Sequence, residues 1–320
     1  MRAVRLHGFG GPDGLRHEEV ADPEPGPGRV RIAVRAAGVR WADTAVRRGE
    51  APWALPDLPA VPGGEVAGVV DAVGPGVPGT WSGARVVTQL GWAGGGYAEL
   101  VVREVDALHL VPDGVGFAAA VAMVGTGAAA LGVLAASGVG AGDVVLVTAA
   151  AGAVGNLVVQ GASRRGARVV GAVGHAAKRG AALRAGAVLA VDYRREGWVD
   201  EVRAAVGEVD VVSDGVGGVV GRAAVDLVCA GGRVVLHGAS SGALTTLSTE
   251  DLFARSLTVS AGPVCRAGTR VWERRALAAV AAGELRPVLR EFALADAAAA
   301  HAALEARATV GKVVLVPAAG

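Results

Sequence analysis

The chain has 320 residues, of which 52% are apolar and 19% charged, with a formal net charge of +1. This length and composition predict one large domain or two ordinary ones with a substantial core. The near-neutral charge gives no reason to expect nucleic acid or an anionic membrane as a partner. We also expect no membrane-spanning helix, because Gly, Arg and Asp should interrupt every apolar run before it reaches about 20 residues.

The first 120 residues predict a compact β domain. Residues 30–34 alternate polar and apolar, and residues 66–70 and 84–87 form short apolar runs, as strands do. Proline and glycine clusters between them indicate turns. The N-terminus lacks the apolar segment of a signal peptide, and Cys229 and Cys265 form no CxxC or Cys/His cluster. We therefore expect a cytoplasmic protein with two ordinary thiols.

The pattern changes near residue 117. A stretch rich in Ala and Leu, residues 117–136, predicts one or two helices, and strands then alternate with helices. Expected strands lie at residues 144–148, 168–173, 187–191, 209–213 and 233–237, and the chain ends with a strand at 312–316. Strands that alternate with helices predict right-handed βαβ units and a parallel, doubly wound sheet, which makes the fold class α/β.

A glycine-containing loop follows the first of these strands and opens a helix, where a dinucleotide fingerprint is expected. Gly152 would let the backbone approach a pyrophosphate, and Gly155 would allow close contact between helix and strand. With Ala153 and Val154 they form the start of the helix, whose N–H groups and positive dipole end attract negative charge. The usual first glycine is Ala here, so a tight turn without a ligand is the alternative.

The end of the second strand bears on the choice of cofactor. NAD sites carry Asp or Glu there to bond the ribose hydroxyls, whereas this chain has Gly174, His175 and, one turn on, Lys178. Gly174 would leave room for a 2′-phosphate, and Lys178 is one of only two lysines among 31 basic residues. Tyr193 follows the third strand at the same sheet edge. The pattern predicts NADPH; a solvated basic helix start is the alternative.

Taken together, these residues resemble the medium-chain dehydrogenase/reductase superfamily, in particular its NADPH:quinone oxidoreductase, or zeta-crystallin-like, branch. The resemblance covers nearly the whole chain. It is carried by residues 9–12, 37–39 with Asp43 and Gly49, 62–68, 95–99, the dinucleotide loop, Gly174 with Lys178 and Tyr193, 238–242 and 308–312.

The resemblance implies a GroES-like β domain, residues 1–122 and 267–320, and a Rossmann domain, residues 123–266, with the active site in the cleft between them. It also implies a homodimer paired through the Rossmann sheet. Near the nicotinamide it places His237, Gly238 and Ser240, and His237 either relays a proton or simply packs there.

Zinc-dependent members of this superfamily use a Cys shortly after the Ala-Gly-Val stretch and a His before the Glu of a Gly-His-Glu motif. Here residues 40–43 and Gly64 stand in those places. Catalytic zinc needs about three protein ligands, so we expect no metal. Without a Lewis acid to stabilise an alkoxide, alcohol oxidation is disfavoured, whereas an electrophilic acceptor such as a quinone or enone needs no metal.

Arg40 departs from the family, which usually has Asn there, on the substrate side of the nicotinamide pocket. Arg40 and Asp43 are therefore the candidate catalytic residues. Arg40 either anchors an anionic substrate or a developing enolate, points to solvent, or pairs with Asp43. Trp41, Trp53 and Trp92 lie on segments that border the family's cleft and suit either a planar substrate or packing.

The expected function is NADPH-dependent hydride transfer to a quinone or another conjugated carbonyl compound. No tyrosine stands in the position of the proton donor of enoyl-thioester reductases, and quinones take protons from water. Two alternatives stay open: an enoyl or ene reductase that tailors a natural-product intermediate, and an NADPH-binding protein with little turnover.

Overall fold

The computed structural model describes residues 1–51, 55–91, 94–262 and 269–318. The described chain divides into two compact units. The first unit comprises residues 1–125, 277–282 and 289–320, and the second comprises residues 126–276 and 283–288. The limits expected for the two domains from the sequence, 1–122 with 267–320 and 123–266, stay a prediction.

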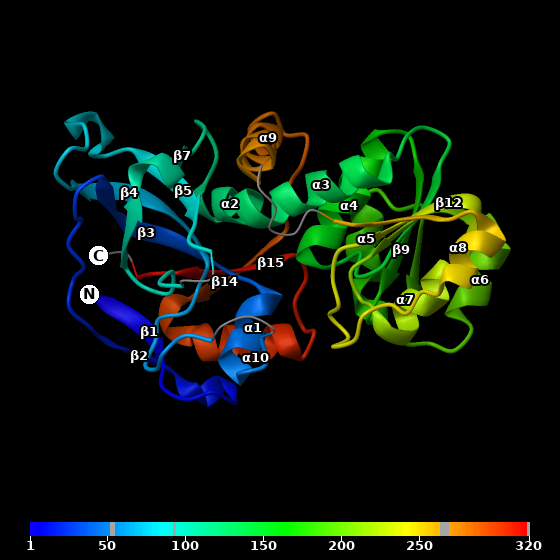
Figure 1. Cartoon of the computed structure of the whole chain (residues 1–320), viewed down its shortest axis with the longest axis horizontal. Coiled ribbons are helices and arrows are strands. Elements are labelled where there is room, and N and C mark those ends of the chain that lie inside the picture. The colour runs from blue at the N-terminus through cyan, green and yellow to red at the C-terminus, as the bar shows by residue number, and fades with distance from the viewer. Residues whose placement is uncertain (52–54, 92–93, 263–268, 319–320) are drawn as a thin grey trace. The chain divides into compact units, whose positions relative to one another are not determined.

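The first unit is a β domain, as the N-terminal pattern predicts, and its sheet is antiparallel except for one parallel pair of strands at one edge (Figure 1). Its strand order is β14-β15-β3-β4-β5-β7, and β6 also pairs with β3; β1 and β2 form a separate hairpin. The strands are β1 Arg2–Leu6, β2 Leu15–Glu19, β3 Arg29–Val39, β4 Glu65–Val73, β5 Arg85–Gln89, β6 Leu100–Glu104, β7 His109–Leu110, β14 Leu289–Ala293 and β15 Lys312–Val316. Alternate residues of β3 and β4, such as Val34 and Val66, enter one core with Tyr97.

The second unit holds a parallel sheet with strand order β10-β9-β8-β11-β12-β13, drawn from green to yellow in Figure 1. The strands are β8 Val144–Val147, β9 Arg168–Val173, β10 Leu189–Asp192, β11 Val209–Asp214, β12 Val228–Leu236 and β13 Thr258–Ala261. This is the 3-2-1-4-5-6 strand order of the Rossmann fold. The chain adds strands outward in one direction from β8 and then in the opposite direction from β11, so the strand order reverses between β8 and β11. Ligands of such sheets bind at that reversal, beyond the carboxyl ends of the strands.

Helices cover both sheets. They are α1 Trp41–Arg48, α2 Phe117–Ala122, α3 Ala128–Ser137, α4 Ala153–Arg164, α5 Arg179–Arg184, α6 Trp198–Val206, α7 Gly218–Val225, α8 Thr249–Arg255, α9 Thr269–Ala281 and α10 Ala297–Glu305. On one face of the parallel sheet, Leu146, Val170 and Val212 pack with Trp198 and Val202 of α6. Residues buried on both faces explain why these strands are continuous apolar runs.

Helix α1 and strand β13 are among the elements that were not predicted from the sequence. Helix α1 interrupts the expected run of strands, and its N-cap is Arg40 where Ser, Thr, Asp or Asn is usual. The side chain of Asp43 satisfies the Arg40 N–H at 2.8 Å, and Gly49 ends the helix with φ of 78°. Strand β13 has only four residues and lies at the edge of its sheet, where half-exposed positions give little periodicity.

The expectation that no apolar stretch reaches the length of a membrane span was wrong. Residues Phe117–Ser137 form 21 continuous helical residues, including the π-helical turn Met123–Gly127, with a mean hydropathy of 2.0. This stretch contains Gly and Thr but no charged residue. Its most apolar window is 67% buried within the fold, which is the behaviour of a core helix and weak evidence for a membrane.

Candidate functional site

The dinucleotide loop has the tight geometry that its glycines predict. A Cβ at Gly155 would lie 2.4 Å from the Ala149 carbonyl oxygen, so only glycine allows this approach of α4 to the strand end. Gly152 is the N-cap of α4, and its N–H donates to the Ala149 oxygen at 2.7 Å. Ala149 has a φ of 49°, a conformation that costs energy for a residue with a Cβ. Ala153 and Val154 form the first helical turn, where backbone N–H groups suit an anion.

The ends of β9 and β10 meet as the sequence predicts. Asp192 pairs in register with Val173, so the residues that follow, Gly174 and Tyr193, lie side by side. A Cβ at Gly174 would be 2.6 Å from the Tyr193 hydroxyl, which makes glycine necessary there. His175 caps the short turn Ala176–Lys178 by accepting the Ala177 N–H at 3.1 Å.

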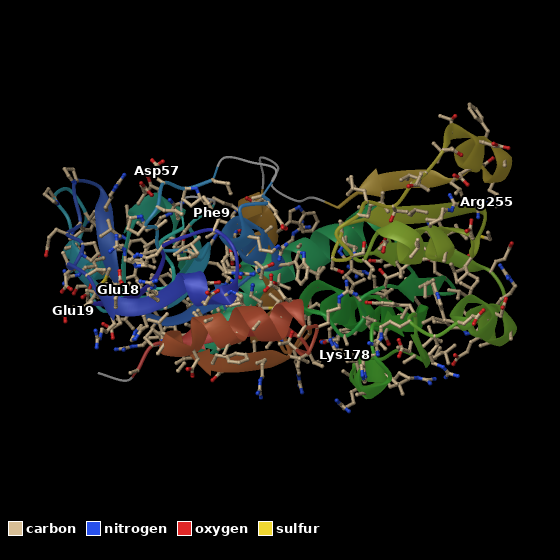
Figure 2. All side chains as sticks on the ribbon, turned by 90° about the horizontal axis from the view of Figure 1, so that it is seen from below. Phe9, Glu18, Glu19, Asp57, Lys178 and Arg255 are labelled. Carbon is tan, nitrogen blue, oxygen red and sulfur yellow. The ribbon has the colours of Figure 1, made fainter. Side chains whose placement is uncertain are left out.

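Lys178 ends that turn and is half-buried (Figure 2). Phenol, imidazole and ammonium groups are therefore gathered beyond two neighbouring strands. A tight glycine turn with a lysine beside it fits a phosphate-bearing dinucleotide.

A buried carboxylate that was not predicted from the sequence lies between β8 and β11, where the strand order reverses. Asp214 ends β11 and accepts the Thr148 hydroxyl at 2.6 Å, while Thr148 accepts the Gly215 N–H at 2.9 Å. Thr148 directly follows β8, so the loops that begin at these two strand ends are joined. The signal in the sequence was an Asp directly after the expected strand 209–213.

The strand expected to end at His237 ends at Leu236, so His237 is the first residue after β12. Its Nε2 is buried without a hydrogen-bond partner among the described residues. Burial lowers the pKa of His237 to about 4, so the ring is neutral at pH 7. The ring lies against Gly215, where a Cβ would be 2.7 Å from the imidazole.

The loop beyond His237 is tied to the loop after β11. Gly238 approaches Gly215 so closely that a Cβ at residue 238 would lie 2.7 Å from the Gly215 carbonyl oxygen. The Ser240 N–H donates to the same oxygen at 3.3 Å. The residues that the resemblance assigns to the nicotinamide are thus brought together, although their role toward a cofactor stays a prediction.

In the first unit, Arg40 is paired with Asp43, one of the three placements left open by the sequence. The Arg40 Nη2 and Nε atoms donate to Asp43 Oδ1 at 2.7 and 3.1 Å, and Nη2 also reaches the Gly91 carbonyl oxygen at 3.3 Å. Asp43 is 3% exposed. Burial alone would lower the pKa of Arg40, but the Asp43 carboxylate outweighs it and raises the pKa.

The guanidinium of Arg40 occupies space that only a glycine leaves. A Cβ at Gly64 would lie 2.0 Å from Arg40 Nη2 and 2.2 Å from Cζ. Gly64 is the position at which the zinc-dependent enzymes have His, and Arg40 lies in the stretch where they have Cys. The two departures are therefore one spatial feature, which we call the Arg40–Gly64 contact.

Replacing Gly64 with alanine should push the guanidinium away from Asp43. We expect a loss of about 1–3 kcal/mol in the free energy of unfolding, the usual cost of an added methyl group in a packed site. In an Arg40→Asn background the same Gly64→Ala change should cost much less, because the shorter side chain vacates the space. Denaturant titrations of the four proteins measure this coupling; equal costs in both backgrounds would contradict it.

Tyr97 is fully buried behind this pair, and its hydroxyl is 2.9 Å from His301 Nε2. Burial and then the Asp43 charge raise the pKa of Tyr97 well above its usual value, and burial lowers that of His301 to about 4. Both groups are therefore neutral at pH 7. Arg40, Asp43 and Gly63 also line a small cavity of ≈ 30 Å³, which is room for a water molecule.

A second buried ion pair in this unit was also missed. Lys312 and Glu65 form it with exposures of only 3% and 1%. Cβ atoms at Gly38 and Gly125 would each lie 2.2 Å from a Glu65 carboxylate oxygen, so two glycines make room for the acid. The signal was present, because Lys312 is the other of the two lysines.

No group of three or more His, Cys, Asp or Glu residues within the described ranges is arranged to hold a metal ion. Trp41 begins α1 and is half-buried. Trp53, Trp92 and Cys265 lie outside the described residues, and Cys229 is a free thiol.

Two family descriptions match the chain. Residues 26–113 match the alcohol dehydrogenase GroES-like domain, and residues 185–315 match the zinc-binding dehydrogenase family. The first match falls in the unit with the antiparallel sheet, and the second covers parts of both units.

Curated relatives and a solved structure match the whole chain. The quinone oxidoreductase of Salmonella typhimurium is 32% identical, covering 98% of this chain and 99% of that protein. A 2-haloacrylate reductase of a Burkholderia species is 33% identical, covering 99% of each. The structure of Escherichia coli quinone oxidoreductase complexed with NADPH has a TM-score of 0.87 and 30% identity, covering 99% of this chain and 100% of that one.

Proposed function

Since the chain belongs to the medium-chain dehydrogenase/reductase superfamily, in its quinone oxidoreductase branch, we propose that it reduces quinones or other conjugated carbonyl compounds with NADPH and without zinc. The family makes it a nicotinamide-dependent reductase of small molecules. The Arg40–Gly64 contact carries the finer proposal, because a guanidinium fills space beside the residue that replaces the zinc-binding His.

The second unit supplies the cofactor residues. The N-terminus of α4, from Gly152 to Gly155, would receive the pyrophosphate. Gly174, His175, Lys178 and Tyr193 would receive the 2′-phosphate, since a half-buried ammonium group stands there and no carboxylate is contributed by residues 174–178. His237, Gly238 and Ser240 would adjoin the nicotinamide. When bound, the cofactor supplies a hydride to the acceptor.

The first unit supplies the acceptor residues. We assign Arg40 as the donor of N–H groups to the acceptor carbonyl oxygen, whose negative charge grows as the hydride arrives. Asp43 holds the guanidinium by two hydrogen bonds and fixes its direction. We assign the proton that completes the reduction to water, since Tyr97 and His301 are fully buried and hydrogen-bonded to each other. The cytoplasmic location and the homodimer stay predictions.

A second candidate is reduction of an α,β-unsaturated carboxylate. The 33% identical relative is a 2-haloacrylate reductase, and a guanidinium suits a carboxylate. The Asp43 carboxylate already neutralises Arg40, however, so the pair carries no net charge to attract an anion. That is why we place neutral quinones and enones first.

Oxidation of NADPH by the purified protein tests the proposal, with quinones, linear enones, an enoyl thioester and 2-chloroacrylate as acceptors. We expect turnover with quinones that persists after exhaustive treatment with a zinc chelator. Turnover with 2-chloroacrylate alone would favour the second candidate. Silence with every acceptor despite NADPH binding would favour a protein with little turnover, and loss of activity with the chelator would contradict the zinc-free assignment.

A further inference from the structure

Asp214 makes more hydrogen bonds than the pairing of its strand requires. The carboxylate is fully buried and accepts the Thr148 hydroxyl, the Val216 N–H at 3.0 Å and the Gly217 N–H at 3.2 Å. The Thr245 hydroxyl donates to its other oxygen. Within the described ranges it forms no ion pair, so neutral donors alone compensate its burial.

The donors to Asp214 come from three different loops. Thr148 follows β8, Val216 and Gly217 follow β11, and Thr245 lies in the loop that follows β12. All three loops leave the carboxyl ends of their strands, on which dinucleotides bind. None of these donors comes from the loops after β9 and β10, where Gly174 and Lys178 lie. The Asp214 carboxylate therefore connects the loops after β8, β11 and β12, and these hydrogen bonds do not extend to the loops after β9 and β10.

The surrounding chain is shaped to admit this carboxylate. A Cβ at Gly221 of α7 would lie 2.3 Å from Asp214 Oδ2, and Gly217 has a φ of 73°. The β8–β11 pairing does not need Asp214, because residues 211–213 pair with residues 145–147. At the opposite end of β11, Asp210 already joins the two strands by accepting the Val144 N–H at 2.7 Å.

We propose that Asp214 is a positioning residue that holds the loops after β8, β11 and β12 in the arrangement that binds the nicotinamide end of the cofactor. It sets the affinity for the nicotinamide end of the dinucleotide, and it leaves the affinity for the adenosine phosphate end unchanged. A Rossmann sheet consists of two mononucleotide-binding halves, here β8 to β10 and β11 to β13. The hydrogen bonds of Asp214 join β8, in the first half, to the loops after β11 and β12 in the second half. This inference rests on the proposed cofactor.

Two ligands separate the two ends of the site: NADPH, and adenosine 2′-monophosphate, which has the 2′-phosphate but neither the pyrophosphate nor the nicotinamide. Calorimetry gives both dissociation constants, and thermal unfolding gives the stability of each variant. Asp214→Asn and Thr148→Val should weaken NADPH binding about tenfold, the scale of one hydrogen bond to a charged group. Both should leave the dissociation constant of adenosine 2′-monophosphate unchanged within about twofold. Thr148→Ser, which keeps the hydroxyl, should restore NADPH binding.

Asp210→Asn is the matched control, since Asp210 lies on the same strand and also joins it to β8, but at the far end. It should lower the unfolding temperature and change neither dissociation constant. If Asp214→Asn does not fold, the two dissociation constants of Thr148→Val and Thr245→Val test the inference instead. Equal weakening of both ligands, or unchanged NADPH affinity, would overturn the inference. Absence of NADPH binding by the wild-type chain would overturn the cofactor assignment and this inference with it.

Discussion

Replacing Lys312 with methionine should destabilise the chain by about 3–5 kcal/mol, the cost of leaving one charge of a buried pair without its partner. Lys312 and Glu65 are 3% and 1% exposed, so water cannot solvate the abandoned carboxylate. Glu65 Oε2 already has no hydrogen-bond partner among the described residues. The free energy of unfolding from a denaturant titration at pH 7 measures the loss.

Two further variants isolate the charge. Glu65→Gln combined with Lys312→Met removes both charges, and it should recover much of the lost stability because neutral replacements of buried pairs are tolerated. Lys178→Met changes the only other lysine of the chain, which is half-buried and not fully buried, and should cost clearly less than Lys312→Met. A loss below about 1 kcal/mol for Lys312→Met would mean that the pair is worth no more than one at the surface.

The parallel sheet was predictable because its strands are buried on both faces. Residues 168–173 were expected as a strand and are β9 with those limits, and residues 209–213 were expected as a strand that the structure extends by one residue as β11. Helix α1 was missed because its N-cap residue is Arg40 and not Ser, Thr, Asp or Asn, and the capping carboxylate comes from Asp43, three residues into the helix. The helix propensities of these residues do not indicate such a cap, because it depends on the geometry of the Arg40 and Asp43 side chains.

The site was predictable where it follows strand ends along the chain. The meeting of Gly174 with Tyr193 follows from the in-register ends of β9 and β10. The contacts that join distant segments were not predictable. Lys312 meets Glu65 across 247 residues of sequence, and Asp214 meets Thr148 across 66. Their residue types were conspicuous, but only the sheet order identifies their partners.

The same reasoning separates the roles of the two lysines. Lys312 has a buried carboxylate partner, and its charge serves the fold. Lys178 lies beside a glycine turn, half-buried, at the edge that we assign to the 2′-phosphate (Figure 2). Its charge is placed where it can distinguish NADPH from NADH, which differ only in that phosphate.

Lys178→Ala should therefore lower kcat/KM for NADPH by about 10–100-fold, the value of a hydrogen bond between charged groups. The kcat/KM value for NADH should stay within about threefold of the wild-type value, because NADH has no phosphate group that the Lys178 ammonium could bind. Arg184→Ala, at the exposed end of α5, removes a nearby cation and should leave the preference unchanged. Parallel losses for both cofactors would assign Lys178 to the local fold, since a residue that only shapes the turn affects both dinucleotides alike.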